Sequence, residues 1–160
     1  MKKTDVPGSI WTNPIHFVAF GFGAGAMKAA PGTFGTLAAV PLYLLLQSLP
    51  LAGYIIVVGI LFGLGVWLCH VTARDLGVHD HPGIVWDEIV GYLIAMITAP
   101  AGWLWLLTGF ALFRLFDVWK PWPIHLIDRH VGGGVGIMFD DAVAGVYAWA
   151  VMYGASQVIL

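Results

Sequence analysis

Acidic side chains occur in three groups, each at the edge of an apolar stretch of the chain. Asp87 and Glu88 precede one stretch, Asp117 follows another, and Asp140 and Asp141 precede the last. Five carboxylates gathered near one surface would repel one another unless a cation lay among them. Hard oxygen ligands suit Mg²⁺, which keeps several waters and is bound through a few carboxylates together with substrate phosphate. This spacing therefore predicts a magnesium site built from three separate parts of the chain.

The same acids also have purely structural interpretations. Asp87 and Asp140 fit the N-caps of helices, where acids stabilise the first turn. Adjacent residues on a helix point about 100° apart, so the two members of a pair are not expected to face a metal in the same way. Asp117 differs, because an acid at the C-terminal end of a helix meets the negative pole of the dipole. Either a metal ion or the cations Arg114 and Lys120, each three residues away, must compensate its charge.

Two further groups of residues suit a phosphate. Lys120, followed by Pro121, is either a lysine that extends to the membrane surface or a ligand of the phosphate. Thr33, Gly35 and Thr36 precede the first apolar segment. Their hydroxyl and backbone N–H groups either bind an anion or form a plain turn with Thr36 as a helix cap.

Two loops complete the candidate site. Asp80 and His81 lie ahead of Asp87, where they could bind metal or transfer protons, although a solvated interfacial loop explains them equally well. The glycine-rich stretch 132–136 is predicted to be a flexible loop that could close over a substrate. These loops would lie beside the acidic groups.

Other phosphatase machinery is not evident. Cys69 and Arg74 are separated by four residues, one short of the spacing in a cysteine-phosphatase loop. Ser9, Ser48 and Ser156 lack the surroundings of a Ser-His-Asp triad. Metal-assisted attack by water fits what remains.

The composition indicates the kind of scaffold that must position these residues. The chain has 160 residues, of which 59% are hydrophobic and only 10% charged, whereas a soluble domain carries about 25% charged residues. We therefore predict one all-α domain, a polytopic membrane helical bundle. The net charge of −2 does not favour nucleic acid as a partner.

Four or five apolar segments are expected to supply the helices. A full span needs about 20 residues, so the second and fifth segments qualify alone, whereas the others must tilt or be extended by their flanks. The break at 100–102 makes the third and fourth segments either a tight hairpin, which we prefer, or one long kinked helix. The segments are Leu37–Leu49, Leu51–Cys69, Ile89–Ala99, Gly102–Phe113 and Ala142–Leu160.

The charges predict an orientation in the membrane. With the N-terminus in the cytoplasm, the connections 50–53 and 100–102 fall outside and carry no charge. All seven Lys and Arg residues, Lys2 and Lys3 included, then fall inside or near the inner end of a helix, which is the positive-inside pattern. All nine carboxylates fall on the same side. The candidate site is therefore expected at the cytoplasmic face.

Four ordered motifs resemble one known family. They are PGTFGTL (31–37), HDHPGIVWDEIVG (79–91), FRLFDVWKPWPI (113–124) and GIMFDDAVAG (136–145). Together they resemble phosphatidylglycerophosphatase A, a family of bacterial membrane lipid phosphatases, from about Asn13 to Ala155. The resemblance implies one lipid phosphatase domain over residues 1–160, in the bacterial inner membrane. It also implies magnesium-dependent hydrolysis of phosphatidylglycerophosphate to phosphatidylglycerol at the inner leaflet.

The resemblance also implies roles for the matching residues. The matching positions are the five acids named above, as metal ligands, and Lys120, with the Thr33 region alongside. In the mechanism that we expect, Lys120 and Arg114 offset the charge on the phosphate, and Asp80 or His81 manages protons. Two alternatives stay open: an ion-transport membrane protein, although the acids avoid the middles of the spans, and a nucleotide-lipid phosphotransferase, although such enzymes carry their aspartates within one segment.

Overall fold

Helices account for all the regular secondary structure in the computed structural model, which describes residues 5–159. The predicted all-α fold is therefore confirmed for this part of the chain. Two short 3₁₀ turns, η1 and η2, and seven α-helices follow one another. Their bounds are η1 Gly8–Trp11, α1 Pro14–Ala19, η2 Ala24–Ala26, α2 Pro31–Leu46, α3 Leu51–Leu76, α4 Trp86–Ala95, α5 Trp103–Trp119, α6 Ile124–His130 and α7 Gly133–Ile159.

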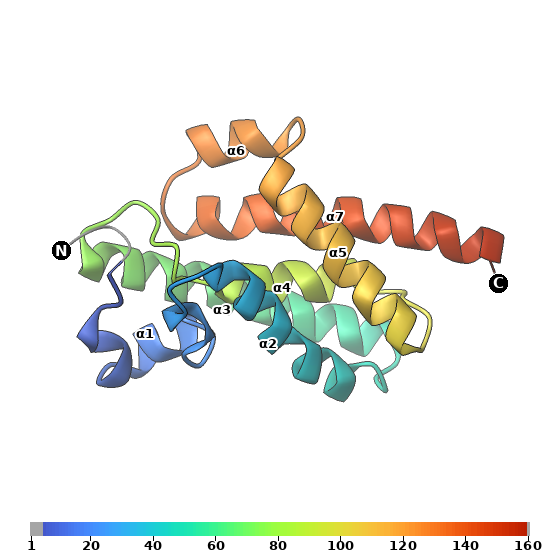
Figure 1. The fold of residues 1–160 in the computed structure, drawn as a ribbon, viewed down its shortest axis with the longest axis horizontal. Coiled ribbons are helices and arrows are strands. Elements are labelled where there is room, and N and C mark those ends of the chain that lie inside the picture. Colours follow the sequence, from blue (N-terminus) through green and yellow to red (C-terminus); the bar gives the residue numbers. More distant parts are fainter. Residues whose placement is uncertain (1–4, 160) are drawn as a thin grey trace.

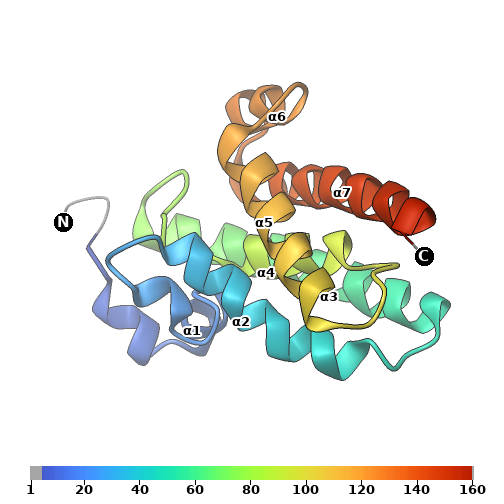
Figure 2. The ribbon, with the colours of Figure 1, turned by 45° about the vertical axis from the view of Figure 1, so that its right-hand side comes forward.

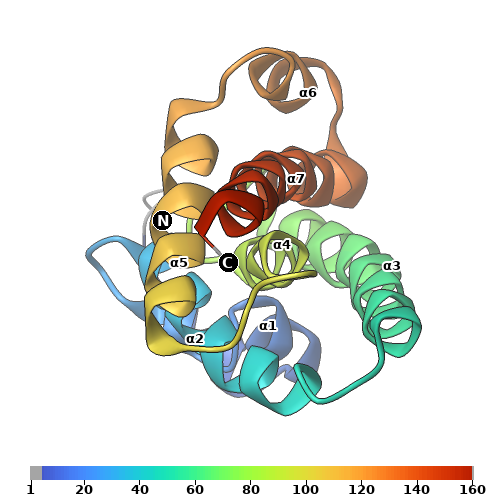
Figure 3. The ribbon, with the colours of Figure 1, turned by 90° about the vertical axis from the view of Figure 1, so that its right-hand side faces the viewer.

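The shortest of the helices that match the predicted apolar segments, α4, lies at the centre of the molecule. Viewed end-on, α4 is surrounded by α2, α3, α5 and α7 (Figure 3). Its side chains are buried almost all round, including Val90, Tyr92 and Leu93, which are fully inaccessible. A helix that is apolar on every side must be enclosed by others. The first turn of α4 carries Asp87 and Glu88, so the centre of the bundle also positions the acids.

The predicted apolar segments correspond to α2, α3, α4, α5 and α7, but three of them, α2, α4 and α7, begin earlier than expected. The first helix starts at Pro31 rather than Leu37, with proline in the first turn, where its missing N–H costs nothing. The last starts at Gly133, so the predicted loop at 132–136 is wrong after its first residue. Gly134 lies against α3, and a Cβ there would overlap the carbonyl oxygen of Val66. These glycines therefore allow close helix packing.

Two helices of the described chain are long and apolar enough to cross a bilayer, α3 and α7. They contain the two segments that the sequence indicated as full spans. The other apolar helices are shorter, and α4 and α5 are separated by a break over residues 96–102, which agrees with the preferred hairpin. Leu160, the predicted end of the last segment, lies outside the described residues.

The connections between the helices lie at two opposite ends of the bundle. The α2–α3 and α4–α5 connections lie at the same end as the last turn of α7 (Figure 1). The elements η1 and α1, the α3–α4 loop, α6 and the start of α7 lie toward the other end, and a rotated view shows the same division (Figure 2). Of the described Lys and Arg residues, Lys28, Arg74, Lys120 and Arg129 lie at helix ends or in connections, and Arg114 lies in α5 five residues before its end. Lys2 and Lys3 lie outside the described residues.

Candidate metal and phosphate site

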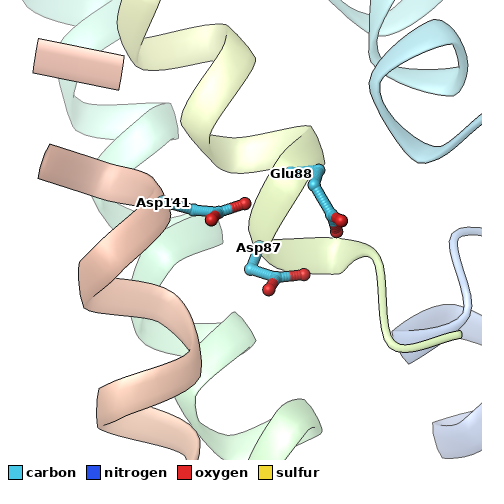
Figure 4. Close-up of side chains that lie close together, drawn as sticks. All are labelled: Asp87, Glu88 and Asp141. Carbon is cyan, nitrogen blue, oxygen red and sulfur yellow. The ribbon is translucent and has the colours of Figure 1, made fainter. Parts of the chain in front are cut away.

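Three carboxylates from two helices meet at the charged end of the bundle. Asp87 and Glu88 lie in the first turn of α4, and Asp141 extends toward them from α7 (Figure 4). One oxygen from each side chain lies within 4.8 Å of the others. We call Asp87, Glu88 and Asp141 the acidic cluster. The three residues come from two of the motifs quoted above. Glu88 and Asp141 are 53 positions apart in the sequence, and only the packing of α4 on α7 brings them together.

The acidic cluster is largely buried, and some of its carboxylate oxygens have no hydrogen-bond partner in the described part of the chain. Asp87 is 9% exposed and Asp141 is 3% exposed. Within the described residues, Asp87 Oδ1, Glu88 Oε2 and Asp141 Oδ2 are buried and have no hydrogen-bond partner. Burying unpaired carboxylates is costly unless a cation or donor compensates them. Three convergent carboxylate oxygens are the donor set that a hard divalent cation prefers, so these residues fit a magnesium ion.

Neither predicted cap is present. Asp87 is the second residue of α4, and the N-cap Val85 makes no side-chain capping bond. Asp140 lies about two turns inside α7, because that helix begins at Gly133. The N-cap interpretation of both acids is therefore wrong, although Asp87 does lie in the first turn of α4, where an acid is favourable. Both acids are instead buried, and both lie among other charged side chains.

The two acidic pairs behave differently from each other. On α7, Asp141 joins the acidic cluster while Asp140 turns to Lys120, as the angular separation of adjacent residues predicts. On α4, both Asp87 and Glu88 contribute an oxygen to the same cluster. The expectation that the members of a pair would diverge is wrong for this second pair.

Arg114 neutralises the acidic cluster from one side. Its guanidinium forms an ion pair with Asp117 on the same helix, and Nη1 lies 3.8 Å from Glu88 Oε1. Asp117 is close enough to Glu88 and Asp141 for the carboxylates to repel one another. The structure thus brings Asp117 beside the cluster but pairs it with Arg114. Its predicted role as a metal ligand stays a prediction.

Lys120 occupies the other side of the site, just after α5. Its Nζ donates hydrogen bonds of 2.8 Å to both Asp128 and Asp140. Burial alone would lower the pKa of Lys120, but the hydrogen bonds and charges of these two carboxylates raise it above its ordinary value. The lysine therefore stays charged and links α6 to α7. Asp128 was not among the predicted site residues, because nothing local distinguishes a carboxylate eight positions after Lys120.

The start of α2 closes over the acidic cluster. A Cβ on Gly32 would overlap Glu88 Oε1 and lie 2.9 Å from Arg114 Nη1, so any larger residue would have to displace the ends of these two side chains. Thr33 is half-buried beside it. Thr36 donates a hydrogen bond of 2.9 Å to the Gly32 carbonyl, and Gly35 packs on Val85. The predicted plain turn is therefore a helical first turn, whose N-terminus favours anions.

Asp80 and His81 are adjacent in the sequence but lie in different surroundings. The Gly83 N–H donates to His81 Nδ1 at 3.0 Å, and Nε2 lies 3.3 Å from the Asp5 carbonyl. Both ring nitrogens are thus engaged with the backbone, and the ring packs near Phe20. Asp80 instead lines a small polar pocket with residues of the site, namely His79, Asp87, Asp128 and Asp140.

One serine has surroundings that the sequence did not reveal. Ser9 Oγ lies 2.9 Å from His16 Nδ1, and His16 Nε2 lies 3.3 Å from Asp75. The serine contacts the opposite ring nitrogen from that in a serine-hydrolase triad, and Asp75 is also held by Arg74 at 2.9 Å. These contacts join η1 and α1 to the end of α3.

Comparisons with known proteins agree with the motifs. A family model described as phosphatidylglycerophosphatase A matches residues 17–156. The chain is 50% identical over 143 residues to a phosphatidylglycerophosphatase A of Escherichia coli K12, covering 89% of this chain and 83% of the relative. It is 47% identical over 143 residues to a phosphatidylglycerophosphatase A of Haemophilus influenzae, covering 88% of each chain. No solved structure matches the chain.

Proposed function

Because this chain belongs to the phosphatidylglycerophosphatase A family, we propose that it hydrolyses the terminal phosphate of phosphatidylglycerophosphate to give phosphatidylglycerol and inorganic phosphate. The observation that carries the proposal is the acidic cluster, in which one oxygen of each carboxylate lies within 4.8 Å of the others. Each of the three carboxylates also has a buried oxygen with no hydrogen-bond partner in the described chain. Such a cluster suits a phosphatase, because a phosphate monoester is itself bound through a divalent cation. Family membership favours this hydrolase over the ion-transport and phosphotransferase alternatives.

The acidic cluster would hold Mg²⁺ through Asp87, Glu88 and Asp141. When bound, the ion would polarise the phosphoryl group and favour attack by water at neutral pH. Asp117 and Asp140 lie beside the cluster, where each is paired with a cation. We infer that these two acids position Arg114 and Lys120.

The cations and the helix N-terminus would bind the anionic substrate. Arg114 presents a planar fork of donors that matches phosphate oxygens. Its side chain is only 20% exposed, so its charge is largely shielded from solvent, where such charges stabilise a transition state strongly. The first turn of α2 lies beside Glu88 and Arg114 at Gly32, so the positive end of its dipole would favour an anion there, and the Thr33 hydroxyl would add a donor. Asp80, in the adjoining polar pocket, is placed to accept or return a proton.

The proposed enzyme works at the inner leaflet of the bacterial inner membrane. In this arrangement α3 and α7 cross the bilayer, and α2, α4 and α5 complete a multi-pass bundle. The charged end would face the cytoplasm, in accordance with the positive-inside rule. The phosphate would meet the site at the interface while the acyl chains stay in the hydrocarbon layer.

Removing divalent metal is expected to abolish activity. Protein purified in detergent should release phosphate from phosphatidylglycerophosphate, and excess EDTA should lower the rate by about 100-fold or more, since metal stabilisation of the transition state is worth several kcal/mol. Readdition of Mg²⁺ should restore the rate, whereas added Na⁺ should not. Full activity in excess EDTA would contradict the metal-dependent proposal.

Enlarging Gly32 by one methyl group is expected to disturb the acidic cluster. The new Cβ in Gly32→Ala would displace Glu88, so we expect about a tenfold loss of activity and a higher Mg²⁺ requirement, as for other residues that orient metal ligands. Gly63→Ala on α3 is the matched control, because a Cβ there meets nothing within 4 Å. The measurement is the phosphate-release rate across a Mg²⁺ titration. Equal behaviour of the two variants would contradict the role assigned to Gly32.

A further inference from the structure

An apolar groove runs along the outside of the bundle between α2 and α5. It has a volume of about 620 Å³. Every side chain that lines it is apolar, and it is open along its length rather than enclosed. Three lining residues come from α2, namely Leu37, Val40 and Pro41, and the others lie along α5 from Trp103 to Phe110.

The groove leads directly away from the proposed phosphate site. The same two helices approach each other at Gly32 and Arg114, where a Cβ on the glycine would lie 2.9 Å from the guanidinium. From Arg114 to Trp103 the chain of α5 covers eleven residues, or about 16 Å at 1.5 Å per residue. That length matches one leaflet, since the whole hydrocarbon core is about 30 Å thick. The seam between α2 and α5 thus has a charged end at Arg114 and an apolar end at Trp103, and the two ends are separated by about the depth of one leaflet.

We propose that this groove binds one acyl chain of the lipid substrate, with the phosphate headgroup at the Arg114 end. This inference rests on the proposed function and adds a subsite to it. The charge distribution favours a lipid as the occupant, because an anionic headgroup and an apolar tail match the two ends of one continuous seam. A partner helix would fill the apolar part but would leave the charged end without its anion.

The advantage of such a groove would be orientation rather than attraction. Lipid tails are as apolar as the side chains of the groove, so a chain gains little free energy by leaving the bilayer for it. A chain held between α2 and α5 would, however, fix the headgroup over the acidic cluster, which lowers the entropic cost of reaching the reactive geometry. The groove should therefore matter for long-chain substrates and not for the headgroup alone.

The first test fills the groove. Leu107→Trp narrows it, and Leu104→Trp is the matched control, because Leu104 lies on the same helix with nearly the same exposure, 59% against 57%, but does not line the groove. We expect Leu107→Trp to lower kcat for long-chain phosphatidylglycerophosphate about tenfold, equivalent to about 1.4 kcal/mol. Its KM for that substrate, and its turnover of the deacylated headgroup substrate, should stay near the wild-type values. Equal effects of both variants, or an equal loss on the deacylated substrate, would overturn the proposal.

The second test does not depend on turnover. Phosphatidylglycerophosphate carrying a photoreactive group midway along an acyl chain is cross-linked to the wild-type protein, and the modified residues are mapped. Labelling concentrated at Leu37–Pro41 and Trp103–Phe110, and lost in Leu107→Trp, is expected. Labelling spread evenly onto the exposed face of α3, such as Ile56 and Ile60, or protein–protein cross-links across the groove, would overturn the proposal. Specific labelling without phosphate release would retain the groove and reject the proposed hydrolysis.

Discussion

Asp141→Asn is expected to lower the rate of phosphate release about 10²–10³-fold, the loss that commonly follows removal of one electrostatic contact to a transition state. The amide keeps the size of the side chain but removes one of the three charges in the acidic cluster. Asp141 is buried, its Oδ2 has no partner in the described chain, and it is repelled by its acidic neighbours. The protein should therefore fold without this charge. Only cation binding, and the chemistry that depends on it, should suffer.

Thermal unfolding in detergent separates this outcome from a folding defect. A ligand that binds only the folded state raises its stability, so Mg²⁺ should raise the unfolding temperature of the wild-type protein relative to EDTA. The same addition should leave Asp141→Asn unchanged. Asp75→Asn is the control, because Asp75 is an exposed acid paired with Arg74 and lies outside the site. Its activity should stay near the wild-type value, and its cost in stability should be about 0–1 kcal/mol.

Asp117→Asn is expected to lower the rate about 100-fold by releasing Arg114, since the guanidinium would lose the partner that holds it beside the acidic cluster. Arg114→Gln should cause at least as large a loss. If Asp117 acts through Arg114, the double variant should be no worse than Arg114→Gln alone, because residues that share one interaction are not additive. The measurements are the phosphate-release rates of the three variants under saturating Mg²⁺.

If Asp117 is instead a metal ligand, the losses of phosphate-release rate caused by the two single substitutions should multiply in the double variant. The Mg²⁺ concentration for half-maximal activity would also rise in Asp117→Asn but not in Arg114→Gln. Near-normal activity of Asp117→Asn would remove the residue from the site altogether.

The apolar segments were predictable because hydropathy alone marks helices that avoid water. Segments around Leu51 and Ala142 were long enough to be recognised as spans, and they became α3 and α7. The starts of the helices were less predictable. Glycines at 132–136 resemble a loop in sequence, but their small size allows α7 to pack on α3, so the helix begins before Asp140.

The candidate site was predictable in its residue types but not in its pairings. Asp87, Glu88 and Asp141 were recognised as carboxylates, and only the packing of α4 on α7 distinguishes them from Asp140. The partner of Lys120 on α6, Asp128, depends on how the chain turns after α5, which local sequence does not determine. The fit of Gly32 against Glu88 likewise depends on a tertiary contact rather than on a local pattern.

The most direct test of the account is to measure divalent-cation binding itself. Mn²⁺, which shares the preference of Mg²⁺ for carboxylate ligands, is titrated into detergent-purified protein and followed by electron paramagnetic resonance. We predict that the wild-type protein and Asp75→Asn bind Mn²⁺ alike and that excess Mg²⁺ displaces it. Asp141→Asn should bind it at least about tenfold more weakly, because one of three charged ligands is lost. Equal binding by all three proteins would contradict the assignment of the acidic cluster as the metal site.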